Sequence, residues 1–225
     1  MVTLLGDLRR RLRAPEPPAV AAEEPEELEP VPGLGREVEF AAYAEDCRVF
    51  GFMRLTADRM TDALNDSAEY LLTDVMVVRL DDAMATQTTD LTVRREEVLA
   101  VRAAGPRGDP ARRSRRRPYP ITLKTGPYVI HGYVHGLPGA DPIQQIRRRK
   151  TMVPLTESWI EYQSGGQNHR ARVGTIVVNH ELWDWVRLSR DEEIRLPDLP
   201  AETKPDPRAK DLTGHIRGPE SYQEA

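Results

Sequence analysis

The sequence predicts a mainly β protein of two tandem five-stranded small barrels, each with a short helix, between disordered N- and C-terminal tails. Three observations predict this fold. The chain contains an internal repeat, its apolar runs are short and rich in strand-forming residues, and proline-rich charged segments separate those runs. At 225 residues the chain has room for two small domains.

The repeat is clearest in two apolar stretches that have a glycine at the same place. Residues 47–54 align with residues 128–135 at an offset of 81 residues, which pairs Gly51 with Gly132. The many aromatic and β-branched residues predict a strand in each stretch. A glycine inside a strand is typical of a sharp bend or of the close approach of a neighbouring strand. We therefore expect Gly51 and Gly132 to lie at equivalent bends.

Each half continues with a short helix, a strand, a turn, a β-rich run, a tight turn and a last strand. In the first half the helix is expected at 58–65, the strand at 70–78 and the turn at 81–82, and the β-rich run ends at Val93 and the last strand at Val101. In the second half the helix is expected at 141–147, the strand at 153–160 and the turn at 164–168, and the β-rich run ends at Val178 and the last strand at Val186. Asp141 and Pro142 are the residue types preferred at an N-cap and at a first helical position. Five short strands bury their apolar side most simply by curling into a barrel.

A carboxylate follows a Leu-Thr pair at the same place in both halves, as Asp74 and Glu157. A residue type that recurs in both halves answers a shared structural demand more often than it serves a reaction. We therefore predict a structural role for both carboxylates.

The end of each half resembles the strand–turn–strand ending of SH3-like and Sm-like small barrels. It consists of a valine, polar residues with a glutamate, and a second valine eight positions after the first, from Val93 to Val101 and from Val178 to Val186. The resemblance covers residues 38–102 and 119–188 and concerns topology and hydrophobic pattern. It implies a small-barrel fold for each half. Sm-like proteins commonly form rings that bind RNA, but the chain has no residue-level RNA-binding motif of that family.

Composition divides the chain into six segments. The first has leucines at helical spacing before a run of arginines, which predicts an amphipathic docking peptide; these leucines are Leu4, Leu5, Leu8 and Leu12. Proline-rich segments of high charge predict linkers and tails. The segments are the peptide 1–14, an acidic linker 15–37, the first barrel 38–102, a basic linker 103–118, the second barrel 119–190 and a tail 191–225.

Positive charge gathers in two clusters, although the net charge is −4. They lie in the basic linker and after the second predicted helix, and consist of Arg112, Arg113, Arg115, Arg116, Arg117, Arg147, Arg148, Arg149 and Lys150. Arginine binds phosphate bidentately, so the clusters are candidate contacts for nucleic acid or a protein partner. However, residues 15–105 carry −12 and residues 106–190 carry +9. We therefore favour pairing within the chain or between copies.

Enzyme chemistry has no positive support in the sequence, and we expect no catalytic residue, cofactor or metal. His131 and His135 lie in a predicted strand, where residues four apart are separated by ~13 Å, too far for one ion. Asp58, Asp62 and Asp66 lack the alternating ligands and the glycine of a calcium loop. They fit the solvated face of a helix.

The single cysteine, Cys47, excludes an intramolecular disulfide. No apolar run approaches the ~18–20 residues that a membrane helix needs, and no secretory signal is evident. We therefore expect a cytoplasmic protein. Arginine outnumbers lysine 28 to 4, which indicates a bacterial genome rich in GC.

Together these features predict a non-catalytic interaction or scaffold protein. Its N-terminal peptide would dock on a protein partner through a flexible acidic tether, and self-association would use the complementary charges. Two alternatives stay open. One is an Sm-like nucleic-acid-binding protein, and the other is a peripheral membrane protein that uses residues 1–14 as an interfacial helix.

Overall fold

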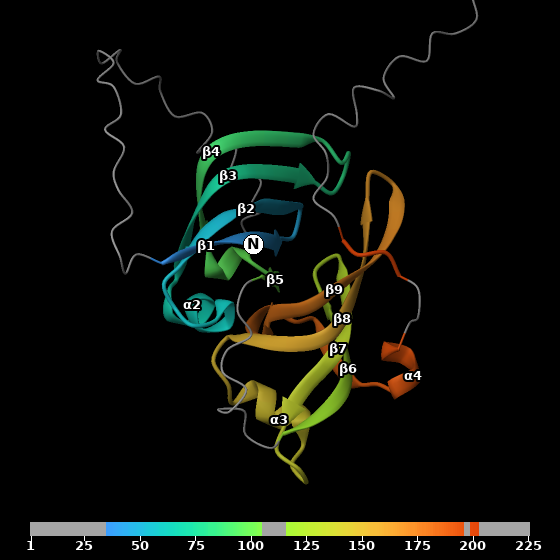
Figure 1. Cartoon of the computed structure of the whole chain (residues 1–225). Coiled ribbons are helices and arrows are strands. Elements are labelled where there is room, and N and C mark those ends of the chain that lie inside the picture. The colour runs from blue at the N-terminus through green and yellow to red at the C-terminus, as the bar shows by residue number, and fades with distance from the viewer. Residues whose placement is uncertain (1–34, 105–115, 196–198, 203–225) are drawn as a thin grey trace, which may run out of the picture.

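Ten antiparallel strands form one sheet in the computed structural model, which describes residues 35–104, 116–195 and 199–202. Their order is β10-β6-β7-β8-β9-β5-β1-β2-β3-β4. Figure 1 shows β1 to β4 at one end of the molecule and β6 to β9 at the other, with β5 between them. The predicted mainly β class is confirmed. The sequence predicts a separate sheet for each half, whereas pairing between β5 and β9 joins all ten strands into one.

The first half of the sheet contains five strands, a short helix and one 3₁₀ turn. In chain order they are β1 (Arg36–Tyr43), β2 (Cys47–Leu55), α2 (Met60–Asp66), β3 (Glu69–Arg79), β4 (Ala85–Arg94), the turn η1 (Arg95–Glu97) and β5 (Ala100–Ala103). The predicted helix and strands of this half therefore form, with ends that differ by one or two residues.

The second half contains the same elements and one more helix. In chain order they are β6 (Arg117–Thr125), β7 (Tyr128–Gly136), α3 (Pro142–Arg147), β8 (Met152–Ser164), β9 (Gln167–Asn179), the 3₁₀ turn η3 (His180–Leu182), β10 (Trp185–Leu188) and α4 (Asp191–Ile194). The predicted start of α3 is confirmed, because the Asp141 carboxylate accepts hydrogen bonds from the Ile143 and Gln144 N–H groups and Pro142 begins the helix.

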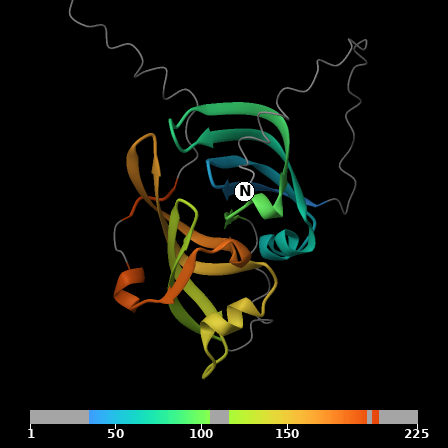
Figure 2. The ribbon, with the colours of Figure 1, turned by 180° about the vertical axis from the view of Figure 1, so that it is seen from behind.

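Both halves have the same strand order, with the fifth strand first and the fourth strand last: β5-β1-β2-β3-β4 and β10-β6-β7-β8-β9. The pairing register also corresponds. Tyr43 of β1 lies opposite Ala100 of β5, and Lys124 of β6 lies opposite Trp185 of β10. The two sets of five strands are thus arranged alike. Figure 2 shows the same sheet from behind.

Gly51 and Gly132 lie where β2 and β7 change register against the next strand. A Cβ atom at Gly51 would approach the Thr73 carbonyl oxygen to 2.9 Å. One at Gly132 would collide with the Ser158 hydroxyl and lie 3.1 Å from the Ser158 Cβ. The close approach predicted at both glycines is confirmed.

Asp74 and Glu157 have left-handed backbone, with φ of 48° and 51°. Each lies opposite one of the two bent strands, where β3 or β8 departs from regular pairing. Left-handed backbone is uncommon for residues other than glycine, and aspartate is one of the types that tolerate it best. The carboxylate that recurs in both halves therefore marks a shared backbone bend, which is the structural role that the sequence predicts.

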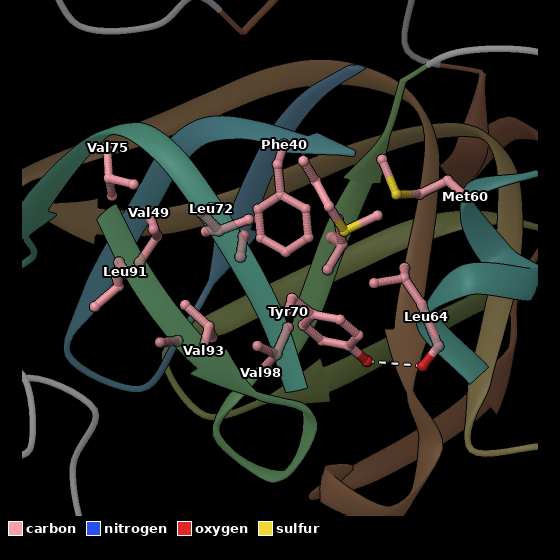
Figure 3. Packing of buried hydrophobic residues seen from close by; sticks show 14 of the residues in the cluster. Phe40, Val49, Met60, Leu64, Tyr70, Leu72, Val75, Leu91, Val93 and Val98 are labelled. Atoms are coloured by element: carbon pink, nitrogen blue, oxygen red, sulfur yellow. Dashed lines mark hydrogen bonds between the residues drawn. The ribbon is translucent and has the colours of Figure 1, made fainter. Parts of the chain in front are cut away.

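The two larger of the three hydrophobic clusters each take residues from both halves. Figure 3 shows the first cluster, where Tyr70 packs beside Leu64 of α2 and donates a 2.7 Å hydrogen bond to its carbonyl oxygen. Met152 of β8 belongs to this cluster, and Tyr43 of β1 belongs to the second cluster. Because the clusters share residues across the halves, the described part of the chain folds as one unit.

The described part of the predicted tail is ordered, so the prediction of an unstructured segment from residue 191 is wrong for residues 191–195 and 199–202. Ile194 of α4 is buried, and so is Glu202. The reason is that one apolar and one acidic side chain find partners far away in the sequence, which a composition rich in proline and charge does not reveal.

Other boundaries differ by up to two residues. The strand β1 begins at Arg36, β5 ends at Ala103 and β6 begins at Arg117, inside the linkers predicted at 15–37 and 103–118. The predicted docking peptide 1–14 lies outside the described residues, and so do the residues of the basic linker Arg112, Arg113 and Arg115. Among the described residues, no helix combines the length and the apolar character needed to cross a membrane.

Candidate interaction surfaces

The seam between the halves pairs β5, the fifth strand of the first half, with β9, the fourth strand of the second. Ala100 lies opposite Val178, and Arg102 lies opposite Ile176. Beside this ladder, the Asn65 side chain donates to the Met152 carbonyl oxygen at 2.9 Å and accepts from the Met152 N–H at 3.0 Å. This amide reproduces the pairing of a neighbouring strand and fixes how the halves meet.

The two ends of the sheet are strands of the same two kinds. They are β4, the fourth strand of the first half, and β10, the fifth strand of the second. On β10, Trp185 and Leu188 are 43% and 50% exposed. On β4, Asp90 is the only charged residue from Ala85 to Val93. The charged residues of the two strands are Arg187 on β10 and Asp90 and Arg94 on β4. Edge strands usually carry charges or prolines that prevent pairing, so edges with this little charge are candidate contact surfaces.

A buried polar cluster, here called the socket, lies beside the seam and consists of Tyr43, Arg48 and Tyr162. Arg48 Nη1 donates to the Tyr162 hydroxyl at 2.6 Å and lies 3.2 Å from Glu202 Oε1. The Tyr43 hydroxyl donates to Glu202 Oε2. The Arg48 guanidinium also covers the Tyr162 ring, 4.9 Å from its centroid. A glutamate from the C-terminal segment is thus held by residues from both halves.

Glu202 belongs to a short segment, residues 199–202, here called the strap. Ala201 makes a parallel bridge with Arg172 of β9, and the Glu202 N–H donates to the Arg172 carbonyl oxygen at 3.1 Å. Arg102 Nη1 donates to the Glu202 carbonyl oxygen at 2.8 Å. The strap therefore adds to the edge of β9 just beyond the seam, and Glu202 is its only buried residue.

Burial raises the pKa of the Tyr43 hydroxyl well above its usual value, and the neighbouring Glu202 raises this pKa further. Burial likewise raises the pKa of Tyr128 and of the Cys47 thiol. A thiol that stays protonated is a poor nucleophile. The Cys47 side chain is a packed core group of the first cluster.

The two basic clusters meet in space as far as the structure describes them. Burial, and after it the nearby Arg116 guanidinium, lowers the pKa of Arg149. Arg117 lies on β6 opposite Gly136 of β7, the strand that leads to α3. The members after α3 divide into two groups: Arg147 and Arg148 are exposed, whereas Arg149 donates to the His135 carbonyl oxygen and Lys150 lies 2.8 Å from Asp66 of α2.

The contact between Lys150 and Asp66 is an example of the charge pairing predicted between the halves. Both side chains are more than half exposed. An exposed pair contributes little to stability, so this contact does not hold the halves together.

The carboxylates and histidines considered as metal ligands have structural positions. His131 and His135 lie on β7, the strand that the sequence predicts. Asp62 and Asp66 lie on α2, and Asp58 precedes it. Among the described residues, no group of three His, Cys, Asp or Glu side chains is placed to hold a metal ion.

His131 is buried against Trp159, with the two rings parallel and 3.7 Å apart. Burial, followed by the charge of Arg187, lowers the pKa of His131 to about 4. Protonation below the unfolded value of ~6.5 therefore favours the unfolded chain, and we expect stability to fall as pH drops from ~6.5 to 4. His131→Phe keeps the stacking and should flatten this part of the profile. Urea denaturation of both proteins between pH 4 and 7 measures the difference, and equal slopes would contradict it.

A shallow groove of about 700 Å³ opens between β2, α2 and the start of β3. Its apolar lining includes Phe52, Tyr70 and Leu71, the last of which is 63% exposed. Glu37 and Asp66 place acidic charge at the lining. Gly35, the first described residue, also lines the groove, which is a second candidate surface on the first half.

The socket is the feature that the sequence analysis missed. Its signal is the arginine in the otherwise apolar run of residues 47–53, because an arginine inside a predicted core strand needs a buried acidic partner. The run does not identify that partner, since Glu202 lies 154 residues away. Comparison with known proteins adds no assignment: no family model, no curated protein and no solved structure matches this chain.

Proposed function

We propose that the protein is a non-catalytic scaffold that associates with further copies of itself through β4 and β10. In this proposal each half is a small barrel of the SH3-like or Sm-like kind, and the chain is a pseudo-dimer of the two. One observation carries the proposal. The seam pairs the fifth strand of the first half, β5, with the fourth strand of the second half, β9. The two ends of the sheet are the remaining fourth and fifth strands, β4 of the first half and β10 of the second.

The seam supplies a register for pairing between copies. The strand β10 corresponds to β5 and β4 corresponds to β9, at the offset of 85 residues. Within the chain, Ala100 of β5 lies opposite Val178 of β9. The residues that correspond to them are Trp185 of β10 and Val93 of β4, so the same register places Trp185 of one copy opposite Val93 of the next. Such a contact joins two different surfaces, so repeating it gives a closed ring or an open filament.

Self-association is expected in solution at micromolar concentration. Light scattering coupled to size-exclusion chromatography should give a mass that is a multiple of 25.5 kDa. Trp185→Lys should shift the protein towards the monomer, because it places a charge on the paired edge. Leu137→Lys is the matched control, since Leu137 is 55% exposed and lies outside the strands. A monomeric wild-type protein would overturn the proposal.

A second candidate function is nucleic-acid binding, and the meeting of the two basic clusters favours it. Arg117 begins β6 and Arg116 precedes it, and both lie near the end of α3, where Arg147 and Arg148 are exposed. Guanidinium groups gathered in this way match the phosphates of a nucleic-acid backbone. We rank this function second because the two other cations after α3, Arg149 and Lys150, already have partners within the chain.

Salt-dependent binding separates the two functions. If the basic clusters bind RNA, log K should fall with log salt with a slope of about 0.7 per phosphate neutralised on a single strand. Arg147→Ser with Arg148→Ser should reduce that slope. We expect no binding tighter than micromolar at ~150 mM salt. Tight binding that these substitutions abolish would promote the second function over the first.

A further inference from the structure

We propose that the socket is a binding site for the glutamate carboxylate of an extended segment of a partner protein, and that Glu202 is its intramolecular occupant. The strap then acts as a built-in competitor that keeps the site filled. This inference is independent of the association through β4 and β10, because the socket and the strap's contacts use residues of β1, β2, β8, β9 and β5 and none of β4 or β10.

The socket is built for a carboxylate. The Arg48 side chain is 8% exposed, and Tyr43 and Tyr162 are 1% and 6% exposed. These residues donate to both oxygens of Glu202, through Arg48 Nη1 and the Tyr43 hydroxyl. A second donation from Arg48 to the Tyr162 hydroxyl fixes the guanidinium in place. Charge-assisted donors held by buried neighbours distinguish a carboxylate from a neutral amide.

Arg48 retains unused binding capacity. Its Nε atom is buried and has no hydrogen-bond partner among the described residues. A buried guanidinium that keeps an unpaired donor is costly, and one that loses its carboxylate is costlier still. The socket must therefore hold an acidic group, and an occupant that also accepts from Nε would satisfy it better than Glu202 does.

Besides this carboxylate, backbone hydrogen bonds hold the strap. Its backbone makes two hydrogen bonds with Arg172 and accepts one from Arg102. Pro200 and Ala201 are exposed. Little of the strap besides Glu202 is buried, so most of the cost of opening it lies in removing this carboxylate from Arg48, a contact that an incoming glutamate restores. A partner segment of the same kind can therefore replace the strap, pairing with the edge of β9 and placing its own glutamate in the socket.

A peptide that contains the strap sequence is the probe for binding to the socket. A fluorescent peptide of residues 197–204, PDLPAETK, is titrated into the full-length protein, into full-length Glu202→Ala, and into Glu202→Ala with Arg48→Met. A second peptide has glutamine in place of the glutamate. Glu192→Ala is the matched control protein, because Glu192 is an exposed carboxylate on α4.

Glu202→Ala should bind the glutamate peptide at least about tenfold more tightly than the wild type or Glu192→Ala, in which the strap occupies the site at high effective concentration. The glutamine peptide should bind at least about tenfold more weakly, and Arg48→Met should abolish binding. If Glu202→Ala is too unstable for titration, the glutamate peptide should raise its melting temperature and the glutamine peptide should not.

Four results would overturn the inference. The first is a folded Glu202→Ala protein that binds neither peptide. The second is equal binding of both peptides, and the third is binding to the wild type as tight as to Glu202→Ala. An unstable Glu202→Ala protein that neither peptide stabilises also counts against it, because the socket would then accept its carboxylate only as part of the folded chain.

Discussion

Glu202→Ala is expected to lower the free energy of unfolding by about 3–5 kcal/mol. The reason is the Arg48 guanidinium, which stays buried and loses its counter-charge. The side chains of this pair are 8% and 3% exposed, so the guanidinium stays largely shielded from water while the strap is in place. Urea denaturation at neutral pH measures the loss.

The double variant gives this prediction its sharpest test. Arg48→Met combined with Glu202→Ala removes both charges and fills much of the space, so it should be more stable than Glu202→Ala alone. Glu192→Ala, which removes an exposed carboxylate near the same end of the chain, should change stability by less than about 0.5 kcal/mol. A double variant as unstable as the sum of its single variants would mean that the two residues act independently, contrary to the 3.2 Å contact between them.

The local elements of this fold were predictable because their signals are local. The helix α3 starts at an Asp-Pro pair whose side chain and ring satisfy a helix N-terminus by themselves. The bends at Gly51 and Gly132 carry a residue type that the bend requires. Such features depend on a few neighbouring residues, so the local sequence is enough to predict them.

The arrangement of the halves depended on contacts that no local pattern contains. Pairing of β5 with β9 uses backbone groups, and any strand edge offers those groups to any other. Asn65 and Met152 face each other across the seam although 87 residues separate them. The sequence therefore predicts five strands in each half correctly and does not predict that one sheet unites them.

The socket was unpredictable for a related reason. Its acidic occupant, Glu202, lies in a stretch of proline and charge that is typical of a disordered tail. The burial of Glu202 depends on one arginine in β2 and one tyrosine in β1, which the fold brings to the same place. Composition describes the average of a segment, so it does not show that a single residue within that segment is buried and hydrogen-bonded.

Gly132→Ala and Gly51→Ala are each expected to destabilise the protein by about 1–3 kcal/mol, because both substitutions place a Cβ against a packed neighbouring strand. The two sites differ in what the new Cβ meets. At Gly132 it meets the Ser158 side chain, whereas at Gly51 it meets the Thr73 carbonyl oxygen at 2.9 Å, part of the backbone of β3. A substitution can shorten a side chain, but it cannot remove a backbone carbonyl.

Ser158→Ala should therefore rescue part of the stability lost in Gly132→Ala, and it should not rescue Gly51→Ala. The Ser158 hydroxyl has no hydrogen-bond partner among the described residues, so its removal alone should cost little. Rescue should be partial, because the new Cβ still lies 3.1 Å from the Cβ of residue 158 and 3.2 Å from the Thr156 carbonyl oxygen. Thermal and urea denaturation of the single and double variants measure the coupling. If Ser158→Ala rescued both glycine variants equally, the effect would be a general one, and the specific contact between Gly132 and Ser158 would not account for the loss.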